Sequence, residues 1–364
     1  MNAFTYTAHP SRVVFGAGAI NQAGAEVERL GARRALVLAT PEQADAAARV
    51  AALLGERAGG VFAEAVMHVP VETARAARAE AARLGADCAV AIGGGSTTGL
   101  AKAIALESAL PIIAIPTTYA GSEVTPIWGL TEGGVKKTGR DQRVLPKTVL
   151  YDPELTLTLP LALTVTSALN AIAHAAEGLY AHDGNPIVAL MAEEAIRACA
   201  AALPVLAREP RDLSARADAL QGAWLAGIVL GSVAMGLHHK LCHTLGGTFN
   251  LPHAETHTVV LPHALAYNAA RAPGAMARIA RALAAAGALG NAGAVDEVPR
   301  ALQALAARHG APTSLRALGM PAGGVARAAE LAVADPYPNP RPLEREALRG
   351  LIQRAFEGAA PAAA

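Results

Sequence analysis

Hydrophobic positions in the first part of the chain fall into two alternating patterns. Short apolar runs, which are typical of buried strands, occur at residues 12–15, 35–39, 61–66, 88–92 and 112–115. Between them lie Ala-rich amphipathic stretches that predict helices, several of them followed by glycine, at residues 20–30, 45–54, 73–84 and 100–107. Strands that alternate with helices predict a parallel sheet with helices on both faces.

After about residue 152 the strand signals fade. Long Ala- and Leu-rich stretches predict helices at residues 167–181, 187–206, 213–245, 274–286, 295–309 and 343–356. We therefore predict two domains: an α/β Rossmann-like nucleotide-binding domain at residues 1–155, and an all-α catalytic domain at residues 156–364.

Composition narrows the class of protein. The net charge of +1 gives no electrostatic reason to bind nucleic acid or an anionic membrane. The three cysteines have no CxxC spacing, which predicts a reduced, cytoplasmic protein. We expect no membrane association and no secretion signal, because no apolar run reaches the length of a spanning helix and the N-terminus lacks a charged start with an apolar core.

The run at 88–92 leads directly into Gly93, Gly94, Gly95 and Ser96. Glycines let the backbone approach phosphate oxygens, and the following helix offers unpaired N–H groups and a partial positive charge. Lys102, about two turns along that helix, is a candidate phosphate ligand. The alternatives to phosphate binding are an ordinary tight turn at the glycines and a solvated side chain at Lys102.

The next predicted strand ends in a second polar loop that contains Thr117, Thr118 and Tyr119. Ligands bind at the carboxyl ends of strands in open α/β sheets, so two such loops together favour a dinucleotide over ordinary turn chemistry. The strand at 35–39 ends at Thr40 with no carboxylate in place. This leaves both NADH and NADPH open as the cofactor, with Thr40 near its ribose.

Six of the 11 histidines gather in GLHHKLCHTLGGTFNLPHAETHTVVLPH, at residues 236–263. If the helix at 213–245 forms and ends at Gly246–Gly247, His239 and His243 share one face. Asn170 and His174 are likewise one turn apart in an apolar helix. Each could be an ordinary core or surface residue. The alternative is one polar cluster of Asn170, His174, His239, His243 and His253.

Three imidazoles with one carboxylate would suit a divalent metal ion, but the fourth position here is the neutral amide of Asn170. The missing negative charge should lower metal affinity. We therefore favour a site that uses its histidines as hydrogen-bond and proton donors.

The segments GGGS with Lys102, PTT-AGSEVT, LNAIAHAAEGLYA and GLHHKLCHTLGGTFNLPH resemble the iron-containing alcohol dehydrogenase superfamily in order and over nearly the whole chain. That resemblance implies metal ligands at Asn170, His174, His239 and His253, and a further active-site histidine at His243. The sequence departs from the pattern at Asn170 and at Gly99, both of which replace an Asp. GGGSTTGLAKAIAL, PTTYAGSEVTPIWG, NAIAHAAEGLYA and DPYPNPRP are together similar to the maleylacetate reductase branch, and this resemblance implies an enzyme that works without metal.

The resemblance implies reduction of the C=C bond of maleylacetate to 3-oxoadipate, with NADH or NADPH, in aromatic compound degradation. We expect His243 as general acid, with His239 and His174 as further donors and Asn170 for orientation. Tyr119, His238 and His253 are candidates for the substrate carboxylates, while His257, His263 and Arg341 are expected to be structural. A homodimer is expected from the family alone.

Two rival functions stay open. One is a metal-dependent alcohol or carbonyl dehydrogenase of the parent superfamily. The other is a lyase of the dehydroquinate synthase type, which uses NAD without net redox change.

Overall fold

The computed structural model describes residues 4–9, 11–133 and 135–362. The chain separates into an α/β unit at residues 8–159 and a helical unit at residues 160–364, with which the described residues before position 8 group. We predicted the division four residues earlier. The 3-10 helix η6 (Pro153–Thr156) stays with the α/β unit because Leu155 packs against that unit's core.

The α/β unit is built on a six-stranded sheet with strand order β1-β8-β5-β4-β2-β3, and all of its pairings are parallel. Its strands are β1 (Arg12–Phe15), β2 (Ala35–Leu38), β3 (Ala58–Phe62), β4 (Cys88–Gly93), β5 (Ile112–Pro116) and β8 (Thr148–Tyr151). The predicted α/β fold class is confirmed.

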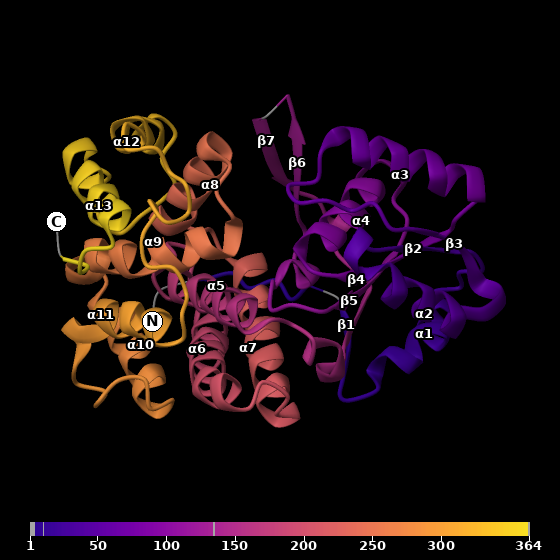
Figure 1. Cartoon of the computed structure of the whole chain (residues 1–364), viewed down its shortest axis with the longest axis horizontal. Helices are drawn as coiled ribbons and strands as arrows, with labels where there is room; N and C mark the ends of the chain where they lie inside the picture. Colours follow the sequence, from indigo (N-terminus) through magenta and orange to yellow (C-terminus); the bar gives the residue numbers. More distant parts are fainter. Residues whose placement is uncertain (1–3, 10, 134, 363–364) are drawn as a thin grey trace. The chain divides into compact units, whose positions relative to one another are not determined.

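Helices cover both faces of this sheet (Figure 1). Side chains of α1 (Ala23–Arg29) and α2 (Ala44–Leu54) share one buried core with Val37, Val90 and Ile113 of the strands. On the other face, α3 (Val71–Leu84) and α4 (Gly95–Ser108) pack on the alternate strand residues, including Leu36 and Ile112. Alternate residues of these strands are buried on opposite faces of the sheet. Burial on both faces explains why the strands are continuous apolar runs in the sequence.

The sequence pattern missed three strands. β8 is only four residues long, and β6 (Ile127–Glu132) and β7 (Val135–Arg140) form a separate antiparallel hairpin. The hairpin gave no signal because the described residues of β6 are mostly half-buried and do not alternate between apolar and polar. The strand that we predicted at 61–66 is β3, which begins at Ala58 and ends at Phe62. We placed its start too late because Gly59 and Gly60 have little strand preference.

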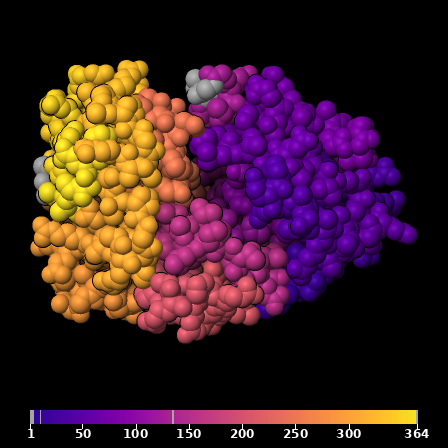
Figure 2. Space-filling model, viewed as in Figure 1, coloured from indigo at the N-terminus to yellow at the C-terminus, as the bar shows by residue number. Residues whose placement is uncertain are grey.

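The helical unit contains α5 (Leu161–Tyr180), α6 (Pro186–Arg208), α7 (Leu213–Ser232), α8 (Leu237–Phe249), α9 (His253–Asn268), α10 (Pro273–Ala285), α11 (Val298–Arg308), α12 (Gly324–Ala334) and α13 (Arg345–Glu357). The predicted all-helical character is therefore confirmed. In the space-filling view the yellow and orange C-terminal helices form part of this unit's surface (Figure 2).

One predicted helix was wrong. The stretch at 213–245 is two helices, α7 and α8, which meet at a bend of 95° around Gly236. The second also continues through Gly246 and Gly247 to Phe249, where Asn250 adopts a left-handed conformation with φ 52°. Within the described residues no single helix is long and apolar enough to cross a membrane, although this bent pair passes by length and composition together.

Candidate active site

The glycine loop lies where β4 meets α4. Gly93 pairs with Pro116 of the neighbouring β5, and the Thr117 amide donates to the Gly93 carbonyl at 3.0 Å. Both polar loops therefore leave the sheet side by side. The chain reverses its direction of progress across the sheet between β2 and β4, since β3 lies on the far side of β2. Such a switch point is where α/β sheets bind nucleotides.

The loop itself fits a phosphate. Gly93 has φ 149°, and a Cβ at this position would lie 2.6 Å from Oε1 of Gln43 and closer still to Thr97. Only glycine satisfies both constraints. At Gly94 a Cβ would meet Thr118, and Gly95 and Ser96 begin α4, which has no side-chain cap and no acidic residue in its first turn. Its N–H groups and positive end suit the pyrophosphate of a dinucleotide.

Lys102 does not fit the role that we predicted. Its ammonium is completely enclosed and donates to the carbonyls of Ser122, Thr125 and Ile127 at 2.6–2.8 Å, and to two hydroxyls. Burial lowers the pKa of Lys102 to about 7, against the attraction of Glu123. Because its ammonium donates these hydrogen bonds to the second loop and to the start of β6, Lys102 holds that loop in place and does not reach a phosphate.

The two threonines of the second loop differ in their exposure to solvent. Thr117 is buried and its hydroxyl accepts from Nε2 of Gln43 at 2.8 Å, while Thr118 is half-buried beside Gly94. Tyr119 is completely buried. The predicted contact of Tyr119 with a substrate carboxylate is therefore not supported, because its ring has no surface to offer.

A carboxylate does lie at the end of β2, where the sequence showed only Thr40. Thr40 begins the 3-10 helix η2 (Pro41–Gln43), whose first turn carries the exposed Glu42. The pKa of Glu42 is lowered by its own backbone N–H and by the Thr40 hydroxyl. We missed this group because it stands four residues beyond the end of β2.

Gly99 has a steric reason to replace the family's Asp. A Cβ at this position of α4 would lie 2.8 Å from Cγ2 of Val69. The close contact of α4 with the residues before α3 leaves no room for a side chain.

The histidines come together from three helices of the helical unit. Asn170 and His174 are on α5, His238, His239 and His243 on α8, and His253 and His257 on α9. Of these, the side chains of Asn170, His174, His238, His239 and His257 are at least 96% buried. The predicted grouping of His174 with the α8 histidines is what the fold builds, and Asn170 is buried one turn before His174 on α5.

Short contacts join these rings in pairs. Nδ1 of His174 lies 2.8 Å from Nε2 of His239, with the rings stacked. Nε2 of His238 lies 3.0 Å from Nδ1 of His257. His257 lies at the centre, with its ring centroid within 6 Å of those of His174, His238, His239 and His253.

Two histidine predictions need correction. His238 is completely buried and bonded to His257, so it offers nothing to a substrate carboxylate. His257, which we expected to be merely structural, takes the central place, while His253 at the start of α9 is exposed. Burial and the neighbouring histidines lower the pKa of His257 well below its usual value, and burial lowers that of His238 to about 3.

A buried acid that the sequence analysis overlooked lies behind the rings. Glu177 of α5 accepts hydrogen bonds from Nδ1 of His239 at 2.6 Å and from the backbone N–H groups of Gly236 and His238 at 2.9 and 2.8 Å. Burial raises the pKa of Glu177, but the hydrogen bond and charge of His239 outweigh it and bring the pKa to about 2. This acid also explains why α8 begins where it does, since it caps the helix from outside.

His243 is the half-buried histidine of α8 and has a partner far along the chain. Its Nδ1 lies 3.1 Å from the hydroxyl of Tyr337, in the segment DPYPNPRP before α13. Burial and the nearby carboxylates of Asp335 and Glu177 raise the pKa of Tyr337. Tyr337 therefore keeps its proton and forms a hydrogen bond with Nδ1 of His243.

The segment that carries Tyr337 is tied to α8 and α9. Lys240 pairs with Asp335 at 3.1 Å, and Asn339 accepts from the Leu237 amide at 3.3 Å. Arg341 stacks over the ring of Tyr267 at 4.1 Å, which agrees with the structural role that we favoured for it, although the contact is to α9 and not to the last helix.

The family resemblance implies a metal ion, and these residues do not reproduce its expected ligand set. His174, His239 and His257 offer nitrogens within 4.8 Å of one another, and Oδ1 of Asn170 is buried without a hydrogen-bond partner in the described structure. His253 is not in this group, however, and no carboxylate joins it because the oxygens of Glu177 are already bonded. A purely neutral donor set binds a dication less tightly than one with a carboxylate.

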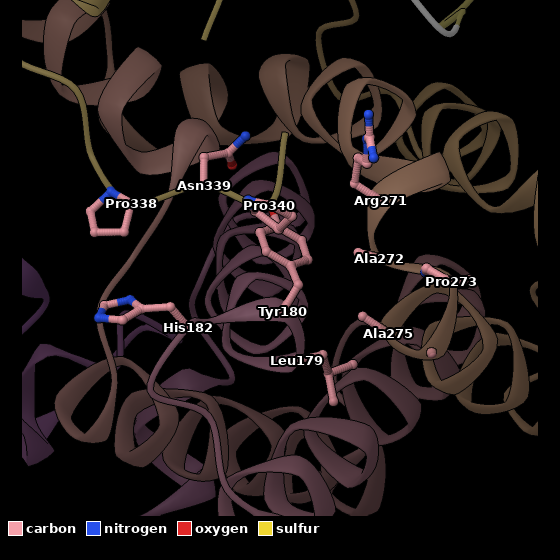
Figure 3. A pocket seen from close by; sticks show the side chains of 11 residues that line it. Leu179, Tyr180, His182, Arg271, Ala272, Pro273, Ala275, Pro338, Asn339 and Pro340 are labelled. Carbon is pink, nitrogen blue, oxygen red and sulfur yellow. The ribbon is translucent and has the colours of Figure 1, made fainter. Parts of the chain in front are cut away.

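A cavity of about 640 Å³ lies elsewhere in the helical unit, between the end of α5, the start of α10 and the segment 338–340 (Figure 3). Tyr180, whose hydroxyl donates to Glu177 at 3.0 Å, forms part of its lining. None of the clustered histidines lines it, so this cavity is separate from the candidate active site.

Comparison with known proteins decides the family. Residues 10–153 match the family of iron-containing alcohol dehydrogenases, and residues 164–356 match the C-terminal part of the Fe-containing alcohol dehydrogenase family. The chain belongs to the iron-containing alcohol dehydrogenase family. Within this family it is an oxidoreductase.

Several relatives that match over the full length are maleylacetate reductases. The chain is 66% identical to maleylacetate reductase of Burkholderia cepacia over 99% of this chain and 100% of that protein. It is 59% identical to the enzyme of the same name from Sphingobium indicum, over 98% and 99%. The crystal structure of maleylacetate reductase from Agrobacterium tumefaciens superposes with a TM-score of 0.92 at 55% identity, over 99% of this chain and 100% of that one.

Proposed function

We propose that this protein reduces the C=C bond of maleylacetate to 3-oxoadipate with NADH or NADPH. One observation of the site carries the proposal: a buried imidazole cluster in which the metal-ligand position holds an amide, Asn170, and the one carboxylate, Glu177, is spent on His239 and the start of α8. This arrangement places no free carboxylate among the described residues of the cluster. The full-length identity to maleylacetate reductases supports the same reaction.

The α/β unit is assigned the cofactor through Gly93, Gly94, Gly95, Ser96, Thr118 and the start of α4. When bound, the reduced nicotinamide supplies a hydride to the alkene carbon β to the substrate ketone. Negative charge then develops on the ketone oxygen as an enolate, which returns to the ketone when its α-carbon takes a proton. A single preorganised donor stabilises such a charge by about 3–4 kcal/mol.

His243 is the residue best suited to meet that charge. We assign the Tyr337 hydroxyl as donor to its Nδ1, which places the proton of neutral His243 on Nε2. A half-buried imidazole with its proton on the outer nitrogen serves as donor and general acid. The exposed His253 remains our candidate for a substrate carboxylate, with Asn170 as an orienting amide.

We further propose that no metal ion is required, that the enzyme works in the cytoplasm of a bacterium degrading aromatic compounds, and that it is a homodimer without nucleic-acid or membrane partners. The family relationship supports a homodimer, and the neutral ligand set supports metal-free work. These points extend the proposal and are tested separately from it.

The decisive experiment follows NADH and NADPH absorbance with maleylacetate after exhaustive chelation. We expect steady oxidation of the cofactor and formation of 3-oxoadipate. Loss of activity on chelation with recovery on adding Fe²⁺ or Zn²⁺ would refute the metal-free mechanism. Turnover of simple aldehydes or glycerol in place of maleylacetate would favour the metal-dependent dehydrogenase, and product formation without net cofactor oxidation would favour the lyase.

A further inference from the structure

Glu177 is a fully buried acid with an unusual number of donors. Its two oxygens accept from Nδ1 of His239, from three backbone N–H groups in the first turn of α8 (Gly236, His238 and His239), and from the Tyr180 hydroxyl. It stands three residues after His174 on α5, so it shares that residue's helix face. Two histidines from different helices are thus aligned beside one carboxylate.

The hydrogen-bond directions from Glu177 through His239 to His174 follow from the carboxylate being an acceptor. Glu177 already accepts from three backbone N–H groups and from the Tyr180 hydroxyl, so it acts as an ionised acceptor and Nδ1 of His239 is the donor across the 2.6 Å contact. In neutral His239 the other nitrogen, Nε2, is then an acceptor. His174 faces it with Nδ1 at 2.8 Å, so His174 donates from Nδ1 and keeps its lone pair on Nε2.

We propose that Glu177 is the positioning residue of this active site, which sets the Nδ1–H tautomers of His239 and His174 and fixes both rings against α8. This inference rests on the proposed function for its kinetic consequence only. The family's Asp is replaced by Asn170 in this chain. The carboxylate of Glu177 remains beside the cluster, and it acts through His239 and not on the substrate.

The proposal also distinguishes which of the histidines that we predicted as hydrogen-bond donors can donate to a substrate. Both nitrogens of His239 are occupied, by Glu177 and by His174, so His239 bridges and does not touch substrate. His174 presents an acceptor nitrogen. Among the three histidines first assigned as donors, His243 is then the remaining candidate for a donor to the substrate.

The tautomer is measured directly in the wild-type protein, by long-range ¹H–¹⁵N correlation with ¹⁵N-labelled histidine and assignment through His239→Asn. We expect a protonated Nδ1 and a bare Nε2 for His239, in the absence of cofactor and substrate. A proton on Nε2 of His239 would overturn the proposal whether or not maleylacetate is the substrate.

Glu177→Gln removes the charge at nearly constant volume and places an NH₂ group among the donors. We expect mixed His239 tautomers and a kcat lower by about 10–100-fold, the range for loss of a group that orients a functional histidine, with the KM for NADH unchanged. Glu26→Gln is the matched control: Glu26 is also buried, but it pairs with Arg12 and Arg29 in the α/β unit, and its loss should leave kcat intact. A folded Glu177→Gln enzyme with wild-type kcat and one His239 tautomer would refute the role. If that variant does not fold, the wild-type tautomer still decides.

Discussion

The hydroxyl of Tyr337 lies 3.1 Å from Nδ1 of His243, although the two residues are 94 positions apart in the chain. Lys240, one turn from His243 on α8, holds the same segment through Asp335 and lies 5.2 Å from the centroid of the Tyr337 ring. The contact orients the imidazole of the proposed general acid. It therefore links the segment before α13 to the chemistry.

Tyr337→Phe tests this link. The variant keeps the ring but loses the hydroxyl that bonds to Nδ1, so His243 can turn or change tautomer. We expect kcat to fall by up to about tenfold, which matches the net value of one hydrogen bond, while the dissociation constant for NADH holds. Steady-state kinetics with fluorescence titration of NADH measures both, and an unchanged kcat would show that the hydroxyl does not matter.

His243→Ala should have the larger effect. Removal of a general acid lowers kcat by roughly two or more orders of magnitude, with cofactor affinity unchanged. The double variant His243→Ala with Tyr337→Phe is expected to be no slower than His243→Ala alone, since Tyr337 acts through the ring that is already gone. Additive losses in this cycle would mean that Tyr337 contacts the substrate independently.

The fold was largely predictable because its signals are local. Apolar runs such as Cys88–Gly93 and periodic helices such as α5 report burial within one element, and i, i+4 spacing put Asn170 and His174 on one face. The bend between α7 and α8 was not predictable in the same way. It depends on Glu177, a residue of another helix that binds the first N–H groups of α8.

The site was predictable only where spacing carried the information. Glu177 follows His174 by three residues and His257 follows His253 by four, so both could have been found by extending the same helix-face argument. Tyr337 carried no such signal, because its contact with His243 arises only when the segment before α13 folds back on α8. Lys102 was misassigned since burial, which turns an ammonium toward carbonyl oxygens, is invisible in the sequence.

Asn170→Asp tests the role of neutrality at the cluster. The new carboxylate would join His174, His239 and His257 and supply the missing negative charge, so we expect the affinity for Co²⁺ or Zn²⁺ to rise by about tenfold or more. Calorimetric titration measures the change. Asn185→Asp is a suitable control, because Asn185 caps α6 by accepting from Val188 and Asp would do the same. Tight binding by the wild-type protein would contradict the metal-free proposal.

Glu42→Gln tests cofactor preference. A carboxylate at the end of β2 repels the 2′-phosphate of NADPH and accepts from the ribose hydroxyls of NADH. We expect the variant's ratio of kcat/KM for NADPH over NADH to rise several-fold. Glu56→Gln removes the same charge from an exposed site before β3 and should leave the ratio unchanged. An equal ratio in both variants would remove Glu42 from cofactor selection.

His263 predicts acid sensitivity of the helical unit. Both of its ring nitrogens are buried without a partner in the described structure, and burial, followed by the charge of Arg354, lowers the pKa of this imidazole to about 4. An unfolded histidine titrates near 6.5, so between these values the unfolded chain binds more protons and stability falls as the pH drops from about 6.5 to 4. The loss is on the order of 3 kcal/mol at the lower limit, from about 1.4 kcal/mol per pH unit. In His263→Phe, denaturant unfolding measured across this range should show a shallower fall by one proton, whereas an unaltered slope would place this histidine's titration outside the folded-state linkage.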